Sequence, residues 1–143
     1  MTTLRLILGD QLSRDISALE GCDKSRDIIL MCEVWDEATY VKHHKKKIAF
    51  LFSAMRHFAK SLKEEGYNVI YTELDDDDNR GSFAGEIKRA IQDRNIKNVV
   101  VTHPGEYRVF QDMLGWEKAF NVPVEIREDG RFLCSIEEFN CWA

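Results

Sequence analysis

The sequence predicts an α/β domain in which an open, parallel, five-stranded sheet carries helices on both faces. Short apolar runs alternate along the chain with amphipathic helical patterns, which is the order that parallel βαβ units produce. Two of these runs, residues 4–8 and 27–35, are mostly apolar, as strands buried on both faces are. The length of 143 residues is that of one domain.

The first half of the chain supplies two strands and a long helix. Residues 4–8 form the predicted central strand, and residues 27–35 form its neighbour. Between them, helical spacing of apolar residues within 12–24 favours a short helix. Residues 45–65 carry apolar side chains at three- and four-residue spacing and end before Gly66, which predicts a long helix. The first half of that helix is apolar almost all round, so we expect it to be covered on two sides.

The second half continues the alternation. Residues 68–74, 98–102 and 122–127 have the apolar and β-branched composition of strands. A helix capped by Ser82 is predicted to reach about residue 93, and a further helix spans 107–120 with an interruption at Gly115. The acidic run 75–78 lacks the spacing of a calcium loop and predicts a solvated connection.

Composition and charge exclude several classes of protein. No apolar run approaches the roughly 20 residues of a membrane helix, and the N-terminus lacks the pattern of a signal peptide. We therefore expect a cytoplasmic protein with no membrane partner. The net charge of −5 argues against a free-standing nucleic-acid binder. The four cysteines, Cys22, Cys32, Cys134 and Cys141, form no C-x-x-C pair and are expected to be free thiols.

Polar residues follow three of the predicted strands. Gly9, Asp10 and Gln11 follow the first strand, residues 33–40 follow the second, and residues 103–106 follow the fourth. With the strand order 3-2-1-4-5, these loops meet where the order reverses, and ligands of open α/β sheets bind there. The sequence therefore predicts a ligand crevice at this edge.

The residue types in these loops suit a planar heterocycle with a hydroxylated chain. Tyr40 or Trp35 would stack on rings, while Asp10, Glu37 and Glu106 would accept hydrogen bonds from hydroxyl or ring N–H groups. Phosphates suit the crevice poorly, because the sequence has neither G-x-G-x-x-G nor a Walker motif and several acids would repel them.

Plainer interpretations remain open for each of these residues. The two aromatic side chains suit ordinary packing, and the acids suit helix caps or loop ties. His43 and His44 are adjacent and favour a solvated pair over a metal site. Residues 45–47 are three lysines at a predicted helix start, where positive charge is unfavourable; this hints at an acidic partner surface.

Several stretches together resemble a known family. They are LILGDQL at 6–12, EV at 33–34, YVKHHKKKIAF at 40–50, SAMRHF at 53–58 and PGEYRV at 104–109. The sequence resembles the N-terminal domain of the deoxyribodipyrimidine photolyase-related proteins, the iron–sulfur bacterial group of the cryptochrome and photolyase superfamily. The resemblance covers essentially the whole chain.

The resemblance implies a Rossmann-like α/β antenna-binding domain over residues 1–130 and, over 131–143, the start of a linker. The linker would lead to a C-terminal helical domain, absent here, that holds FAD and a 4Fe-4S cluster and contacts damaged DNA. Trp142 is a poor residue to leave exposed at a terminus, so we also expect the sequence to be the first domain of a longer chain. The whole protein would be a carbon–carbon lyase that repairs (6-4) photoproducts with light, or a photoreceptor. The isolated domain would be a non-catalytic monomer whose cysteines are not cluster ligands.

The resemblance also implies an antenna, 6,7-dimethyl-8-ribityllumazine, which passes excitation energy to the FAD. Its expected contacts are Gly9, Asp10, Cys32, Glu33, Val34, Glu37, Tyr40, Leu51, Gly105 and Glu106. Leu51 should pack on the ring, and Gly105 with Glu106 should close the other side. Trp35 departs from the family pattern, and its indole is expected to narrow the pocket.

An alternative from a different class is a flavodoxin-like signalling or interaction domain with no chromophore, since a fold does not fix a function. Receiver domains of this type need a phosphorylatable Asp after the third strand and a Lys after the last one. Residues 73–78 supply acids, but no Lys follows residues 122–127. A nucleotide-binding enzyme domain is a third interpretation, and its glycine fingerprint is missing.

Overall fold

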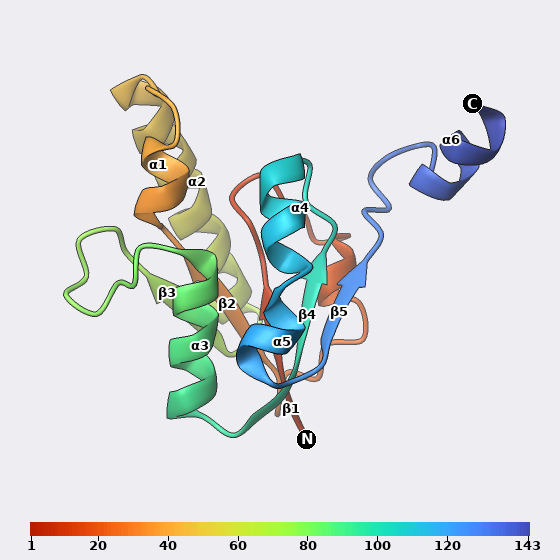
Figure 1. Ribbon diagram of the computed structural model, residues 1–143. Coiled ribbons are helices and arrows are strands. Elements are labelled where there is room, and N and C mark those ends of the chain that lie inside the picture. The colour runs from red at the N-terminus through yellow and green to blue at the C-terminus, as the bar shows by residue number, and fades with distance from the viewer.

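A computed structural model describes all residues 1–143 and contains one wholly parallel five-stranded sheet in the order β3-β2-β1-β4-β5 (Figure 1). The strands are β1 (Thr2–Leu6), β2 (Ile28–Cys32), β3 (Val69–Thr72), β4 (Ile96–Thr102) and β5 (Val124–Arg127). The predicted fold class and strand order are confirmed. The order reverses between β1 and β4, as the location of the crevice requires.

Helices cover both faces of the sheet (Figure 1). One face packs on α2 (Lys45–Glu64) and the 3-10 helix η1 (Ser17–Leu19). The other packs on α3 (Phe83–Asp93), α4 (Tyr107–Met113) and α5 (Trp116–Phe120). Two short helices complete the chain: α1 (Trp35–Thr39) and α6 (Ile136–Trp142), which lies apart from the sheet.

Alternation along β2 explains its continuous apolar run. All five of its residues are buried. Ile28, Leu30 and Cys32 belong to the core under α3 and α4, while Ile29 and Met31 belong to the core under α2. Because successive side chains of a strand point to opposite faces, a strand covered on both sides needs apolar residues at every position.

Several element boundaries differ from those predicted. The apolar run 27–35 leaves the sheet after Cys32, and Trp35 begins α1, whose first turn contains Asp36 and Glu37; acids are favourable there. The short helix expected within 12–24 is reduced to the three residues of η1. By contrast, the predicted interruption of the helix 107–120 at Gly115 is confirmed, because Gly115 lies between α4 and α5.

One residue at each end explains where α2 begins and where it stops. His44 is the N-cap, and its Nδ1 accepts a hydrogen bond from the Lys46 backbone N–H at 3.2 Å, which satisfies one of the free N–H groups of the first turn. Gly66 has a φ of 88°, a conformation that favours glycine and ends the helix. The predicted stop at Gly66 is confirmed, and His44 has a structural role that the sequence did not indicate.

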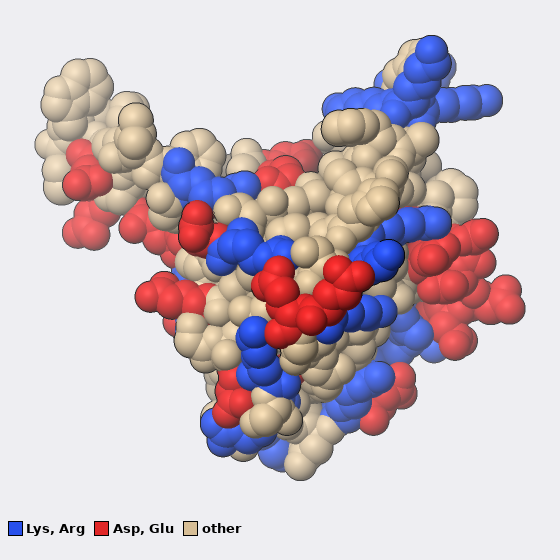
Figure 2. All heavy atoms as spheres, turned by 180° about the vertical axis from the view of Figure 1, so that it is seen from behind, with Lys and Arg blue, Asp and Glu red and all other residues tan.

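Charged residues gather at two places on the surface. Lys and Arg side chains cluster at the tip where α2 begins, and acidic side chains cluster at the loop after β3 (Figure 2). The latter contains the exposed run 75–78, in turns and without regular structure. The predicted solvated loop is therefore confirmed.

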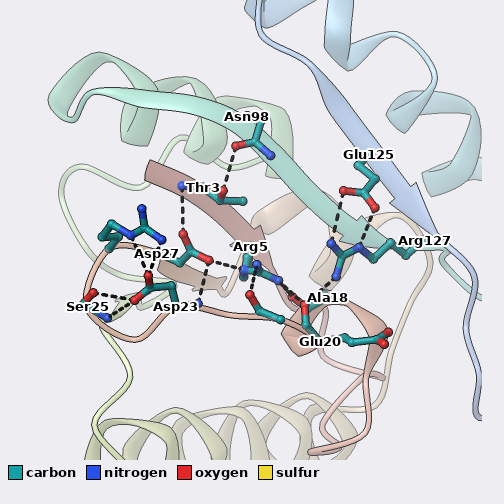
Figure 3. A network of polar contacts seen from close by, with 12 residues as sticks. Thr3, Arg5, Ala18, Glu20, Asp23, Ser25, Asp27, Asn98, Glu125 and Arg127 are labelled. Carbon is teal, nitrogen blue, oxygen red and sulfur yellow. Dashed lines mark hydrogen bonds and ion pairs between the residues drawn. The ribbon is translucent and has the colours of Figure 1, made fainter. Parts of the chain in front are cut away.

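A buried ion pair fixes the segment between β1 and β2 to the sheet (Figure 3). Arg5 Nε donates to Asp27 Oδ2 at 2.9 Å, and the two side chains are only 6% and 7% exposed. The Arg5 guanidinium also donates to the backbone carbonyls of Ala18, Glu20 and Gly21 at 2.8–3.1 Å. One cation thus donates to three carbonyls of this segment, including that of the buried Ala18, which would otherwise lose its hydrogen bond on burial.

The residues after β5 include the short helix α6. Ser135 and Glu138 form a capping box at its start, each side chain bonded to the other's backbone N–H. The S-x-x-E spacing that signals such a box was present in the sequence, but no helix was predicted there. Its large apolar side chains are exposed: Ile136, Phe139 and Trp142.

Candidate functional site

A cavity of about 310 Å³ opens at the carboxyl edge of the sheet, where the strand order reverses. Its walls come from the loops after β1, β2 and β4 and from the first half of α2. Eleven of its nineteen lining residues are hydrophobic. Its volume falls at the lower end of the roughly 300–1,000 Å³ of small-molecule sites, which are mostly apolar with a few placed polar groups.

Nine of the ten residues that the sequence analysis singled out line this cavity. They are Gly9, Asp10, Cys32, Val34, Glu37, Tyr40, Leu51, Gly105 and Glu106. They come from four separate parts of the chain, which the parallel sheet brings to one edge. The predicted crevice therefore exists at the predicted loops.

Glu33 is the exception and does not line the cavity. Its side chain is fully buried, and its carboxylate accepts hydrogen bonds from Arg56 Nε at 2.7 Å, Tyr71 Oη at 2.7 Å and the Leu74 backbone N–H at 2.9 Å. Because neighbouring side chains of an extended segment point to opposite sides, Cys32 and Val34 face the cavity and Glu33 cannot. Glu33 ties α2 to the end of β3.

Burial of Glu33 acts to raise its pKa, but the hydrogen bonds from Arg56, Tyr71 and Leu74 outweigh burial and hold that pKa below its usual value. The carboxylate therefore stabilises the fold above the unfolded-state pKa of about 4.3, and this contribution is lost as the pH falls through the folded-state pKa.

Glu33→Gln is expected to lower the free energy of unfolding at pH 7 by about 1–3 kcal/mol, because an amide cannot accept from all three donors. The difference from the original protein should shrink at pH 3. Urea unfolding at both pH values measures this. Glu65→Gln, which alters an exposed acid paired with Arg14, is the control and should change little. Equal losses at the two pH values would contradict the assigned role.

Gln11 also turns away from the cavity. Its side-chain Oε1 accepts from the Leu8 N–H at 3.2 Å, and its Nε2 donates to the Thr102 carbonyl at 3.3 Å. The buried amide thus joins the ends of β1 and β4 across the point of reversal. Gln11 therefore connects the two loops on either side of the crevice and does not contribute a polar group to it.

Glycine at position 9 allows α2 to approach the loop closely. A Cβ placed there would stand 3.0 Å from Met55 Sδ and 3.4 Å from Leu51 Cδ1, which is tighter than ordinary van der Waals contact. Across the cavity, a Cβ on Gly105 would lie 3.5 Å from Asp10 Oδ2. The absence of a side chain at these two positions therefore lets α2 pack against the loop after β1 and lets Asp10 lie beside the loop after β4.

Three carboxylates stand at the rim of the cavity: Asp10, Glu37 and Glu106. Glu37 and Glu106 both bind Arg108. Asp10 accepts a hydrogen bond through its backbone carbonyl, from Arg131 at 2.8 Å, whereas its carboxylate has no hydrogen-bond partner in the structure. Asp10 is thus the rim acid available to a ligand without breaking an existing ion pair.

Ten further residues line the cavity that the sequence analysis did not assign to the site. They are Leu8, Ala38, His43, Lys47, Ile48, Phe52, Met55, Phe83, Pro104 and Val109. The helical spacing of Ile48, Leu51 and Met55 was visible in the sequence and would have extended the α2 wall. Phe83 comes from α3, at the other side of β2, and carried no such signal.

Trp35 does not narrow the pocket, contrary to the expectation. It is the first residue of α1, is 53% exposed and is not among the lining residues. Even in a continuing strand, alternation would have placed Trp35 on the side of Glu33, away from the side of Cys32 and Val34 that faces the cavity.

Cys32 contributes an apolar contact to the cavity. Burial raises the pKa of its thiol far above the usual value, and the thiol therefore stays neutral and unreactive. All four cysteines are free thiols in the structure. None of the helices has both the length and the apolar composition that crossing a membrane requires.

Comparisons with known proteins show the family of the chain. The family model of the deoxyribodipyrimidine photo-lyase-related proteins matches residues 5–143. A "(6-4) photolyase" of Agrobacterium fabrum (strain C58 / ATCC 33970) is 59% identical over 143 residues, which is 100% of this chain and 28% of that relative. The chain thus spans little more than a quarter of the relative's length. The chain belongs to the deoxyribodipyrimidine photo-lyase-related protein family.

Proposed function

We propose that this chain is the antenna-binding domain of a light-dependent DNA photolyase or bacterial cryptochrome and that its cavity holds 6,7-dimethyl-8-ribityllumazine. The observation that carries the proposal is the cavity at the strand reversal, lined by nine of the ten residues expected to contact this chromophore. When bound, the chromophore would absorb light and pass excitation energy to a flavin elsewhere in the protein.

The residues present fit such a ligand. Leu51, Phe52 and Met55 offer an apolar wall for a planar ring, and the ring of Tyr40 offers a stacking partner. Asp10, with no partner for its carboxylate, would accept hydrogen bonds from hydroxyls of the ribityl chain. Gly9 lets Leu51 and Met55 of this wall pack directly against the loop after β1.

The partners of the whole protein follow from the same proposal. The Agrobacterium relative extends well beyond the matched region, which supports a larger protein with a further domain. In that protein, a C-terminal helical domain would bind FAD, a 4Fe-4S cluster and damaged DNA, and the reaction would be repair of (6-4) photoproducts. The domain described here would supply energy and no catalytic group, and the protein would work in the cytoplasm.

The residue at the end of β5 argues against the signalling alternative. Arg127 occupies the last position of that strand, and its guanidinium donates to the carbonyls of Ser17 and Glu20 at 2.9 and 2.8 Å. It is also paired with Glu125 at 2.8 Å. A cation held in this way is not free to contact a phosphoryl group as a receiver domain requires.

Titration of the purified domain with ribityllumazine, followed by absorbance and fluorescence, tests the proposal. We expect saturable binding that is weakened about tenfold or more by Glu37→Gln or Tyr40→Ala, each of which removes a lining contact. Glu65→Gln, on the far end of α2, is the matched control and should bind normally. Absence of binding both by the domain and by the longer natural protein would overturn the proposal.

A further inference from the structure

Arg108 connects three of the residues around the cavity without lining it itself. It lies in the first turn of α4. Its Nη2 donates to Glu37 Oε1 at 2.8 Å, its Nε donates to Glu106 Oε1 at 3.3 Å, and its guanidinium carbon lies 4.4 Å from the centre of the Tyr40 ring. One planar cation thus makes two ion pairs and a cation–π contact at once.

These contacts join two walls that are otherwise separate in the chain. Glu37 and Tyr40 belong to α1 and its C-cap, and Glu106 precedes α4. Within residues 35–44, the pair of Glu37 with Arg108 is the one ion pair to the rest of the structure. The backbone adds a single hydrogen bond to the neighbouring loop, from Asp36 N–H to the Gly81 carbonyl at 3.0 Å.

The effect of Arg108 reaches further along the same wall. The ring of Tyr40 packs edge-on against His43, with centroids 5.1 Å apart, and His43 Nδ1 lies 3.5 Å from Lys47 Nζ. Tyr40, His43 and Lys47 all line the cavity. Arg108, Tyr40, His43 and Lys47 therefore form a continuous series of side-chain contacts from α4 to the start of α2.

Charge explains why this position needs a cation. Two carboxylates that face the same guanidinium would repel each other without it. Their hydrogen bonds hold the pKa of Arg108 above its usual value, and a guanidinium is charged at every physiological pH in any case. Arg108 also forms ion pairs with two of the three acids at the rim, leaving Asp10 as the acid free to accept from a ligand.

We propose that Arg108 is a positioning residue that holds Glu37, Tyr40 and Glu106 in place around the cavity and thereby sets how long a ligand stays bound. This inference rests on the proposed function for the identity of the ligand. It assigns Arg108 no contact with the ligand, and it predicts that its loss acts through the wall that it secures.

The test compares Arg108→Gln with Arg14→Gln. Arg14 makes the same kinds of contact away from the cavity: its Nε pairs with Glu65 at 3.0 Å, and its guanidinium lies 4.6 Å from the centre of the Phe58 ring. We expect ribityllumazine to dissociate about tenfold faster from Arg108→Gln, since charge-assisted hydrogen bonds are lost, and at the original rate from Arg14→Gln. Stopped-flow displacement with fluorescence detection gives both rates.

Arg108→Lys separates position from charge. A lysine ammonium keeps the positive charge but cannot reach both carboxylates and cover the tyrosine ring in the same geometry. We therefore expect lysine to restore the dissociation rate only in part. The emission anisotropy of bound ribityllumazine should likewise lie between the value for Arg108→Gln and the value for the protein with Arg108. Full rescue by lysine would show that charge alone suffices and would overturn the positioning role.

Amide hydrogen exchange provides a measurement that needs no ligand. Exchange at residues 37–44 should be about tenfold faster in Arg108→Gln, while amides in β1 and β4 stay protected. Unchanged exchange there overturns the inference, whatever the ligand. If exchange rises as expected but the original protein binds no ribityllumazine, the proposed function fails and the positioning role of Arg108 stands.

Discussion

Leu51→Trp is expected to weaken ribityllumazine binding by at least about 30-fold. Leu51 lines the cavity and its Cδ1 lies against the position of Gly9. The cavity of about 310 Å³ is small for its class, and an indole in place of an isobutyl group would occupy space that the ring of the ligand needs. The indole would exclude the ligand sterically, and a roughly 30-fold loss of affinity corresponds to about 2 kcal/mol of binding free energy.

A neighbouring position on the same helix supplies the control. Phe50 is 77% exposed and is not among the lining residues, so Phe50→Trp introduces the same indole one residue earlier and outside the cavity. Isothermal titration of both variants, with circular dichroism to check folding, measures the difference. Unchanged affinity in Leu51→Trp would mean that the ligand site lies elsewhere.

Arg5→Met is expected to lower the free energy of unfolding by about 3–5 kcal/mol, the usual cost of leaving one partner of a buried ion pair alone. Asp27 would lose its cationic partner in a site where its side chain is only 7% exposed. The carbonyls of Ala18 and Gly21 would lose their donor as well, while that of Glu20 would keep its hydrogen bond from Arg127. Urea unfolding at pH 7 measures the loss.

Two further variants identify the cause of that loss. Arg5→Met/Asp27→Leu removes both charges and should be more stable than Arg5→Met, because no unpaired carboxylate remains. Arg26→Met breaks an exposed pair with Asp23 and should leave the urea midpoint nearly unchanged. If the double variant is no more stable than the single one, the loss comes mainly from the carbonyl groups left without a donor and not from the unpaired charge of Asp27.

Residues that face a ligand site and residues that support it look alike in a sequence. Glu33 and Glu37 are both acids after the same strand, yet Glu37 lines the cavity and Glu33 binds Arg56 on the opposite side. Which of the two acids faces the cavity depends on where β2 ends and α1 begins. A shift of this boundary by two or three residues would change the answer. Sequence patterns do not locate such boundaries with that precision.

Arg108 illustrates a different limit. Arg108 stands within the PGEYRV stretch. Its partner Glu37 lies 71 residues earlier in the chain, and its partner Tyr40 lies close to Glu37. Local periodicity carries no information about contacts at such separation. Only the packing of α4 beside α1 brings the guanidinium over the ring.

The sequence by itself determined the α/β class, the parallel sheet and the loops that form the crevice, because apolar periodicity and strand composition are local properties that burial selects. The tertiary structure decided which side chains of those loops meet. Glu33 and Gln11 became supports, Phe83 became part of the wall, and Arg108 became the connection between the two sides. These outcomes depend on the exact ends of strands and on contacts between distant segments, which are set when the whole core packs.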